Sequence, residues 1–234
     1  MLTIAHRGAS GCRPENTLAS FARAAELGAD MCELDVQLTR DGVAVVIHDD
    51  TVDRTTNGRG RVAAMSFDEL RRLDAGCRFG DGRFAGEMIP SLEEVFAATR
   101  GRCGLNVELK APGAERIVAP MMRRFDALND SIVSSFDWDS LARLRAIDSA
   151  IQVGFLADKN PRRMFDAAAA ARAYALCPEF KLATAEFCAE AHRRGLAIYA
   201  WTVDDEAAMK TLTAAGVDGI MTNFPGRMRR LMAV

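Results

Sequence analysis

Residues 31–48 read MCELDVQLTRDGVAVVIH, and most of the fold prediction follows from this stretch. Its first half alternates apolar residues with Glu33 and Asp35, a pattern typical of a strand with one apolar and one charged face. An Asp-Gly pair at 41–42 then separates two β-rich runs, which indicates a hairpin. A hairpin that leaves the end of a strand must come back toward it. We therefore predict that its returning arm brings His48 close to Glu33 and Asp35.

The rest of the chain alternates β-rich runs with amphipathic helical patterns. The eight runs are 2–6, 31–38, 105–110, 132–136, 152–156, 174–177, 197–203 and 219–222. Helical patterns occupy 16–27, 114–128, 140–147, 161–173, 184–194 and 206–215. Gly28, Gly195 and Gly216 stand just after three of these patterns, where left-handed helix caps are common. Repeated right-handed βα units predict an α/β protein with a closed TIM-type (β/α)8 barrel.

Length and composition agree with this prediction. The 234 residues are close to the roughly 250 of a typical barrel, so we expect one domain over residues 1–234. Residues 50–88 are rich in Gly, Arg and Asp and exceed what one connection needs, which predicts a small insertion or cap beside the site. The formal net charge of −2 offers no electrostatic basis for nucleic-acid binding.

The chain is expected to work in the cytoplasm without stable membrane association, as a monomer or a homo-oligomer. Its first residues lack the pattern of a signal peptide, and no apolar stretch approaches bilayer length. The six cysteines form no C-x-x-C pair. We expect them to be small buried hydrophobic residues of a reducing compartment, not disulfides or metal ligands.

Charged residues two apart on two strands predict a metal site. Glu33 and Asp35 share one strand face, and so do Glu108 and Lys110 in the run at 105–110. The apolar residues between them suit packing against outer helices, so the charged ones should point into the barrel. Three carboxylates and an ammonium there are costly unless something organises them; either pair alone would suit a solvated rim of ion pairs, but two such pairs on adjacent strands favour a metal. Oxygen ligands from Glu33, Asp35 and Glu108 suit one divalent cation, Mg²⁺ or Ca²⁺.

Two histidines are candidates for proton transfer. His6 and Arg7 end the first β-rich run, where catalytic residues of barrels stand. His48, returning across the rim, offers His6 a partner for acid and base roles. His192 instead lies at the C-terminal end of a helical pattern, where it is expected to complement the helix dipole.

Two further positions each allow two interpretations. Asn16 either caps the first helix or points its amide into the mouth of the barrel. Trp201, together with Phe180 and Phe224, forms either an apolar wall of the pocket or part of the core.

A set of motifs resembles the glycerophosphodiester phosphodiesterase family in order and spacing over essentially the whole chain. These are HRG (6–8), PENT (14–17), ELDV (33–36), HD (48–49), LDAG (73–76), IPSLEE (89–94), NVELK (106–110), SSF (134–136), WTVDD (201–205) and GVDG (216–219). Each motif is weak singly, whereas the set is highly specific. Asn223 departs from the aspartate that many members carry.

The resemblance implies hydrolysis of glycerophosphodiesters to sn-glycerol 3-phosphate and an alcohol, with a bound Mg²⁺ or Ca²⁺. It assigns Glu33, Asp35 and Glu108 to the metal, His6 and His48 to general acid and base catalysis, and Arg7 and Lys110 to the phosphate. It also identifies residues 50–88 as the family's insertion beside the barrel mouth. Attack by the glycerol 2-hydroxyl, followed by opening of a cyclic phosphate by water, is one route open to such a site.

Three alternatives fit less well. A lysophospholipase D or related lipid phosphodiesterase needs an apolar surface around the mouth, but the insertion is mostly polar, with Phe67, Phe79 and Phe84 scattered singly. A barrel that binds phosphate esters without turnover is expected to lack a histidine or a metal carboxylate. A metal-dependent aldolase or enolising barrel explains the carboxylates, but not the histidines.

Overall fold

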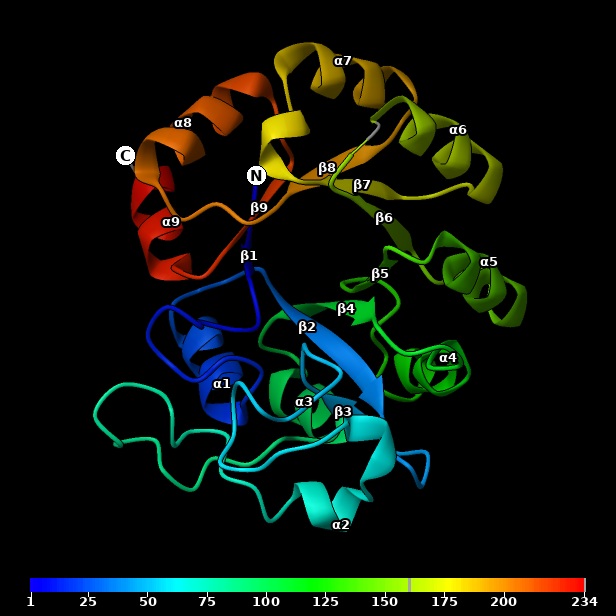
Figure 1. Ribbon diagram of the computed structural model, residues 1–234. Coiled ribbons are helices and arrows are strands. Elements are labelled where there is room, and N and C mark those ends of the chain that lie inside the picture. The colour runs from blue at the N-terminus through cyan, green and yellow to red at the C-terminus, as the bar shows by residue number, and fades with distance from the viewer. Residues whose placement is uncertain (160, 234) are drawn as a thin grey trace.

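A closed ring of parallel strands forms the centre of the computed structural model, which describes residues 1–159 and 161–233 (Figure 1). The ring contains β1 (Leu2–Ala5), β2 (Met31–Leu38), β4 (Gly104–Leu109), β5 (Ile132–Ser135), β6 (Val153–Ala157), β7 (Ala175–Pro178), β8 (Ala197–Ala200) and β9 (Gly219–Thr222). Neighbours follow the order β1-β9-β8-β7-β6-β5-β4-β2. The pairing of Ile4 with Met31 and of Ala5 with Cys32 closes the ring between β1 and β2. The predicted barrel is therefore confirmed.

Helices surround the ring of strands (Figure 1). They are α1 (Leu18–Glu26), α3 (Leu92–Thr99), α4 (Glu115–Arg124), α5 (Trp138–Ile147), α6 (Pro161–Ala171), α7 (Ala185–Arg193), α8 (Glu206–Ala215) and α9 (Pro225–Met232). Gly28, Gly195 and Gly216 have positive φ angles of 75°, 73° and 92°, as expected of left-handed caps. The helical patterns did not include α3. Its signal was local, because Ser91 and Glu94 form a reciprocal capping box.

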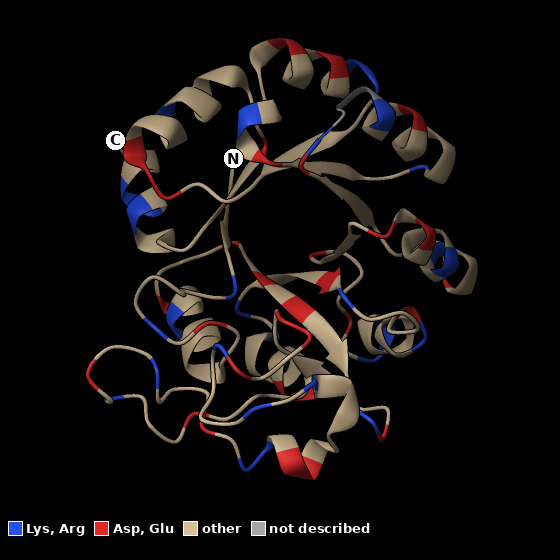
Figure 2. Ribbon diagram, in the orientation of Figure 1, with Lys and Arg blue, Asp and Glu red and all other residues tan. Residues whose placement is uncertain are grey.

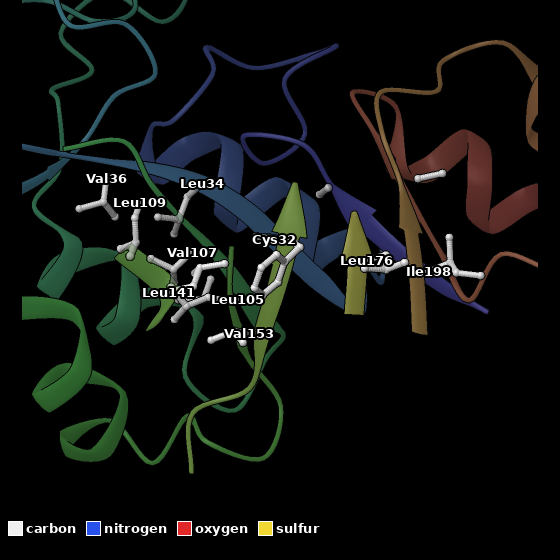
Figure 3. Close-up of a cluster of buried hydrophobic side chains, with 14 of the residues drawn as sticks. Cys32, Leu34, Val36, Leu105, Val107, Leu109, Leu141, Val153, Leu176 and Ile198 are labelled. Carbon is white, nitrogen blue, oxygen red and sulfur yellow. The ribbon is translucent and has the colours of Figure 1, made fainter. Parts of the chain in front are cut away.

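The two faces of the strands bury different kinds of residue. Leu34, Val36, Val107 and Leu109 belong to the large cluster of buried side chains that the strands share with the helices (Figure 3). The opposite face of β2 carries Met31, which packs in a separate cluster with residues such as Ile4 and Tyr199. Glu33 and Asp35 share that inner face because they follow Met31 at intervals of two. The barrel interior is thus apolar near the start of β2 and acidic toward its end.

The predicted hairpin is present and extends β2. Strand β3 (Ala44–Val46) pairs antiparallel with β2, and Val36 lies opposite Val46. The following segment contains the short helices η1 (Val62–Ala64) and α2 (Phe67–Leu70). Figure 1 shows it as the cyan and green loops outside the ring of strands. A small apolar cluster that includes Ile47, Val52 and Leu70 anchors it.

The remaining expectations concern membranes and cysteines. Within residues 1–159 and 161–233, no helix combines the length and apolar character needed to cross a bilayer. All six cysteines are free thiols, and Cys32, Cys177 and Cys188 are buried. The expectation of buried cysteines is wrong for Cys12, which is exposed on the loop after β1. Loops run over the surface, so a small residue there needs no apolar surroundings.

Candidate active site

The ends of the barrel strands surround a cavity of about 80 Å³. It is lined by His6, Arg7, Glu33, His48, Asn106, Glu108, Lys110, Ser134, Phe136, Leu156, Trp201, Thr202 and Met221. Seven of the nine predicted site residues are in this set. Of the other two, Asp35 forms an ion pair with Lys110, and Asn16 donates a hydrogen bond to Asp35. A larger hollow of about 340 Å³ adjoins the cavity and shares Phe136 and Leu156 with it.

Three carboxylates converge at the floor of the cavity. Parallel pairing of β2 with β4 sets Asp35 opposite Glu108, and Glu33 lies one inward position earlier. Figure 2 shows acidic positions along β2, on the ring of strands. One oxygen from each residue lies within 4.8 Å of the others, and all three side chains are buried. The donor set therefore fits a hard divalent cation that prefers oxygen ligands.

The protonation equilibria of these carboxyl groups reflect their crowding. Burial, followed by the charges of Asp35 and Glu108, raises the pKa of Glu33 well above its usual range. Burial and then Asp35 raise the pKa of Glu108 to about 7. Asp35 behaves oppositely, because Lys110 and Arg7 outweigh burial and hold its pKa below the usual value. Without a cation, Glu33 and Glu108 therefore hold protons more readily than usual, and a bound cation would relieve the same repulsion by taking the place of those protons.

Two cationic side chains border the carboxylates. Lys110 Nζ lies 2.6 Å from Glu108 Oε1 and 3.3 Å from Asp35 Oδ1. Arg7 Nε lies 3.5 Å from Asp35 Oδ2, and its backbone N–H donates to Glu33 Oε2 at 3.0 Å. Both side chains remain partly exposed in the cavity. A bound anion would therefore meet two positive groups beside the carboxylate cluster.

His6 reaches the cavity from the end of β1. Its Nδ1 lies 2.8 Å from Asn223 Oδ1, and its Nε2 lies 3.9 Å from Glu33 Oε2. Burial and then the charge of Arg7 lower the pKa of His6 to about 4. The ring is consequently neutral near pH 7.

His48 reaches the same cavity from the returning arm of the hairpin, as predicted. Its Nδ1 lies 2.7 Å from Asp49 Oδ1. Arg54 donates to Asp49 and also to Glu15, which stands on the loop after β1. Hydrogen bonds from Arg54 hold the pKa of Asp49 below its usual range. The insertion is thus tied to the barrel beside the histidine.

The structure also resolves the two open positions. Thr17 caps α1, and Asn16 instead donates its amide to Asp35 Oδ2 at 2.8 Å. Trp201 donates its indole N–H to the Cys177 carbonyl at 2.7 Å and lies edge to face against Phe136. Since Trp201 and Phe136 both line the cavity, the pair forms an apolar wall.

The other aromatic and histidine candidates lie elsewhere. Phe180 and Phe224 are not among the residues that line the cavity. His192 stands in the last turn of α7, as expected, and its Nε2 lies 2.9 Å from Asp218 Oδ2.

The sequence prediction missed four residues around the site. Glu15 and Arg54 hold the insertion, and Asp204 and Asn223 lie behind His6. Asp204 and Asn223 follow the ends of β8 and β9, so the rule that barrel sites form at strand ends could have identified them. The pairing of Arg54 with Glu15 had no such signal, because the two lie 39 residues apart.

Known proteins resemble the chain in sequence along most of its length. The sequence profile of the "Glycerophosphoryl diester phosphodiesterase family" matches residues 6–227. A protein of Caldanaerobacter subterraneus named "Glycerophosphodiester phosphodiesterase" is 41% identical over 237 residues, covering 99% of this chain and 97% of that protein. A protein of the same name from Bacillus subtilis is 33% identical over 246 residues, covering 96% of this chain and 84% of that protein.

Solved structures agree with these sequence matches. A glycerophosphodiester phosphodiesterase from Agrobacterium tumefaciens superposes with a TM-score of 0.87 at 33% identity, covering 98% of this chain and 99% of that one. An Oleispira antarctica phosphodiesterase, solved in complex with the product sn-glycerol-3-phosphate, superposes with a TM-score of 0.92 at 28% identity. The match covers 100% of this chain and 97% of that one. With the profile match over nearly the full length, they confirm the resemblance found in the motifs. The chain belongs to the glycerophosphodiester phosphodiesterase family.

Proposed function

We propose that this chain hydrolyses glycerophosphodiesters to sn-glycerol 3-phosphate and an alcohol, with the help of one divalent cation, Mg²⁺ or Ca²⁺. The observation that carries the proposal is the convergence of three carboxylates, two cationic side chains and two histidines on one cavity. The product complex of the Oleispira antarctica relative supports the product assignment. A cytoplasmic location, and a single barrel domain with residues 50–88 as a cap, are part of the same proposal.

Glu33, Asp35 and Glu108 would hold the cation. When bound, such an ion polarises a phosphoryl oxygen and neutralises charge that develops on it. Asn16 supports this arrangement, because its amide N–H fixes the orientation of the Asp35 carboxylate.

Arg7 and Lys110 would bind the phosphate. A phosphodiester repels nucleophiles through its own negative charge, so positive groups that neutralise its oxygens lower the barrier to attack. Lys110 offers a compact charge, and Arg7 offers donors that can reach two oxygens. Trp201 and Phe136 would pack against the carbon atoms of the substrate.

His6 and His48 would transfer the two protons that hydrolysis requires. One must leave the attacking hydroxyl or water, and one must reach the departing alcohol oxygen. The Nδ1 atom of each ring already has a hydrogen-bond partner outside the cavity, Asn223 for His6 and Asp49 for His48. Proton exchange with the substrate therefore falls to Nε2 in both residues.

A lipid substrate is less consistent with the surface around the cavity. Of the large apolar side chains that are exposed in the described part of the chain, Phe136 alone lines it. Burying acyl chains would need a contiguous apolar surface. We therefore favour deacylated, water-soluble diesters.

The direct test measures release of glycerol 3-phosphate from glycerophosphocholine and glycerophosphoethanolamine, with and without a chelator. We expect release from both substrates, loss of turnover on chelation and recovery with Mg²⁺ or Ca²⁺. The Glu108→Gln variant should need far more metal for the same rate. Full turnover by exhaustively chelated wild-type protein would contradict the metal requirement, and no release under any condition would contradict the proposed activity.

A second assay separates the two routes to the product. A substrate without the 2-hydroxyl lacks the internal nucleophile, whose effective concentration can reach on the order of 10⁵ M. If attack is intramolecular, kcat/KM should fall steeply with this analogue. Equal kcat/KM values for the two substrates would exclude the cyclic route and indicate direct attack by water.

A further inference from the structure

A chain of hydrogen bonds leads from the end of β8 through the end of β9 to the end of β1. Asn223 Nδ2 lies 2.6 Å from Asp204 Oδ2, and Asn223 Oδ1 lies 2.8 Å from His6 Nδ1. Asn223 lies 217 residues after His6 and 19 residues after Asp204, and the three residues meet because β1 and β8 both pair with β9. Asp204 and Asn223 do not line the cavity.

Asp204 determines which way the Asn223 amide points. An ionised carboxylate only accepts hydrogen bonds, so the amide must turn its Nδ2 toward Asp204 and its Oδ1 toward His6. The carboxylate is itself held in place. Its Oδ1 accepts the backbone N–H of Asn223 at 2.9 Å and the Thr222 hydroxyl at 3.0 Å.

The amide orientation in turn determines the tautomer of His6. A carbonyl oxygen cannot donate, so the hydrogen between Asn223 Oδ1 and His6 Nδ1 must belong to the imidazole. Ser10 Oγ lies 2.7 Å from Asn223 Oδ1 and 2.7 Å from the His6 carbonyl oxygen, so two acceptors share its single hydrogen and the orientation of the amide rests on Asp204. In the neutral ring, Nε2 is then the nitrogen without hydrogen, and it is the one on the Glu33 side.

We propose that Asp204 and Asn223 are positioning residues that hold His6 in the Nδ1–H tautomer and present its bare Nε2 to the substrate. This inference rests on the role of His6 in the proposed function. A neutral imidazole without a directing partner exchanges between two tautomers, and only one of them leaves Nε2 free to take a proton. The pair does this without adding a charge next to the ring, because the group that touches His6 is an amide.

The decisive variant is Asp204→Asn. An asparagine at 204 can either donate or accept, so the Asn223 amide is free to flip and offer its N–H to His6 Nδ1. We expect a mixture of tautomers and a fall in kcat of roughly 10-fold to 100-fold, the usual cost of losing a residue that orients a functional ligand, with little change in KM. The matched control is Asp205→Asn, which makes the same charge change at the helix cap of α8, where asparagine is an equally good cap.

The double variant Asp204→Asn with Asn223→Asp supplies the rescue. It reverses the pair, so that the amide at 204 donates to the carboxylate at 223 and an acceptor again faces His6 Nδ1. We expect the Nδ1–H tautomer to return, together with most of the lost kcat. A merely structural role for the pair predicts no such recovery of the tautomer.

The tautomer is read by ¹⁵N NMR of histidine-labelled protein in the presence of Mg²⁺ near neutral pH, with His6→Ala to assign the signals. The proposal predicts a protonated Nδ1 in the wild type, a changed signal in Asp204→Asn and recovery in the double variant. A protonated Nε2 in the wild type, or an unchanged tautomer in Asp204→Asn, would overturn it. The spectrum requires no turnover, so a wild-type protein with the expected tautomers but no phosphodiesterase activity would contradict the proposed function and leave the positioning intact.

Discussion

The two histidines of the site are held in different ways. His6 belongs to the barrel, and its ring is mostly buried against a neutral amide at the end of a neighbouring strand. His48 belongs to the insertion, is about twice as exposed, and contacts the carboxylate of Asp49. Packing and a partly buried hydrogen bond to an amide thus position one histidine, and a more exposed group of ion pairs positions the other. Added salt should therefore weaken the interactions that hold His48 much more than those that hold His6.

Removing each histidine in turn should have the largest effect. His6→Ala and His48→Ala should each lose roughly 10²–10⁴-fold in kcat, because each removes one of the two proton transfers. His192→Ala should stay near the wild type, since His192 pairs with Asp218 instead of lining the cavity. The measurement is steady-state release of glycerol 3-phosphate. If His48→Ala folds normally and keeps full activity, the insertion contributes no proton transfer and the two-histidine mechanism is wrong.

The second prediction concerns the carboxylate floor that both histidines face. The pKa of Glu108 is raised to about 7 in the folded protein, above the roughly 4.3 expected of an unfolded chain. Between these values the folded state binds more protons, so metal-free protein should lose stability as pH rises from about 4.3 to 7. We expect this contribution to be about 2 kcal/mol, allowing for coupling to Asp35.

Urea unfolding at several pH values, with and without Mg²⁺, measures that contribution. The Glu108→Gln variant should show a flatter pH dependence in the absence of metal, because it has no carboxyl group to ionise at that position. At pH 8, added Mg²⁺ should raise the free energy of unfolding of the wild type more than that of the variant. Identical metal-free profiles for the two proteins would show that Glu108 ionises freely and that the carboxylates do not repel one another as the structure implies.

Removing Arg54 should have a smaller effect, which depends on salt. Arg54 joins Asp49 to Glu15, so Arg54→Ala should loosen the segment that carries His48 and lower kcat by about tenfold or less, as expected for partly exposed ion pairs. Raising the ionic strength should lower the wild-type rate toward that of the variant. Arg61→Ala is the matched control, because Arg61 forms a more exposed ion pair with Asp50 in the same insertion. Equal effects of the two substitutions would show that the link to Glu15 has no special role.

Local patterns were enough to predict the barrel and the cluster of three carboxylates at its strand ends. Alternation along β2 and β4 separates apolar from charged residues, and that separation holds wherever one strand face is packed against helices. The hairpin prediction succeeded for the same reason, since an Asp-Gly turn constrains the chain over only a few residues. The helix α3 was missed although its capping box is equally local, because the long insertion concealed where the regular βα alternation resumes.

The contacts that orient the catalytic candidates depend on the closed barrel. Asn16 could have capped a helix, and only the position of β2 beside α1 shows that its amide meets Asp35. Asn223 lies 217 residues from His6, and no periodicity relates the two. Neighbours along the chain were sufficient to predict where the strands lie and which carboxylates share a strand face, because alternation is a local property. The position of Asp204 and Asn223 behind His6 could not be predicted in this way, because that contact forms only when β9 pairs with both β1 and β8.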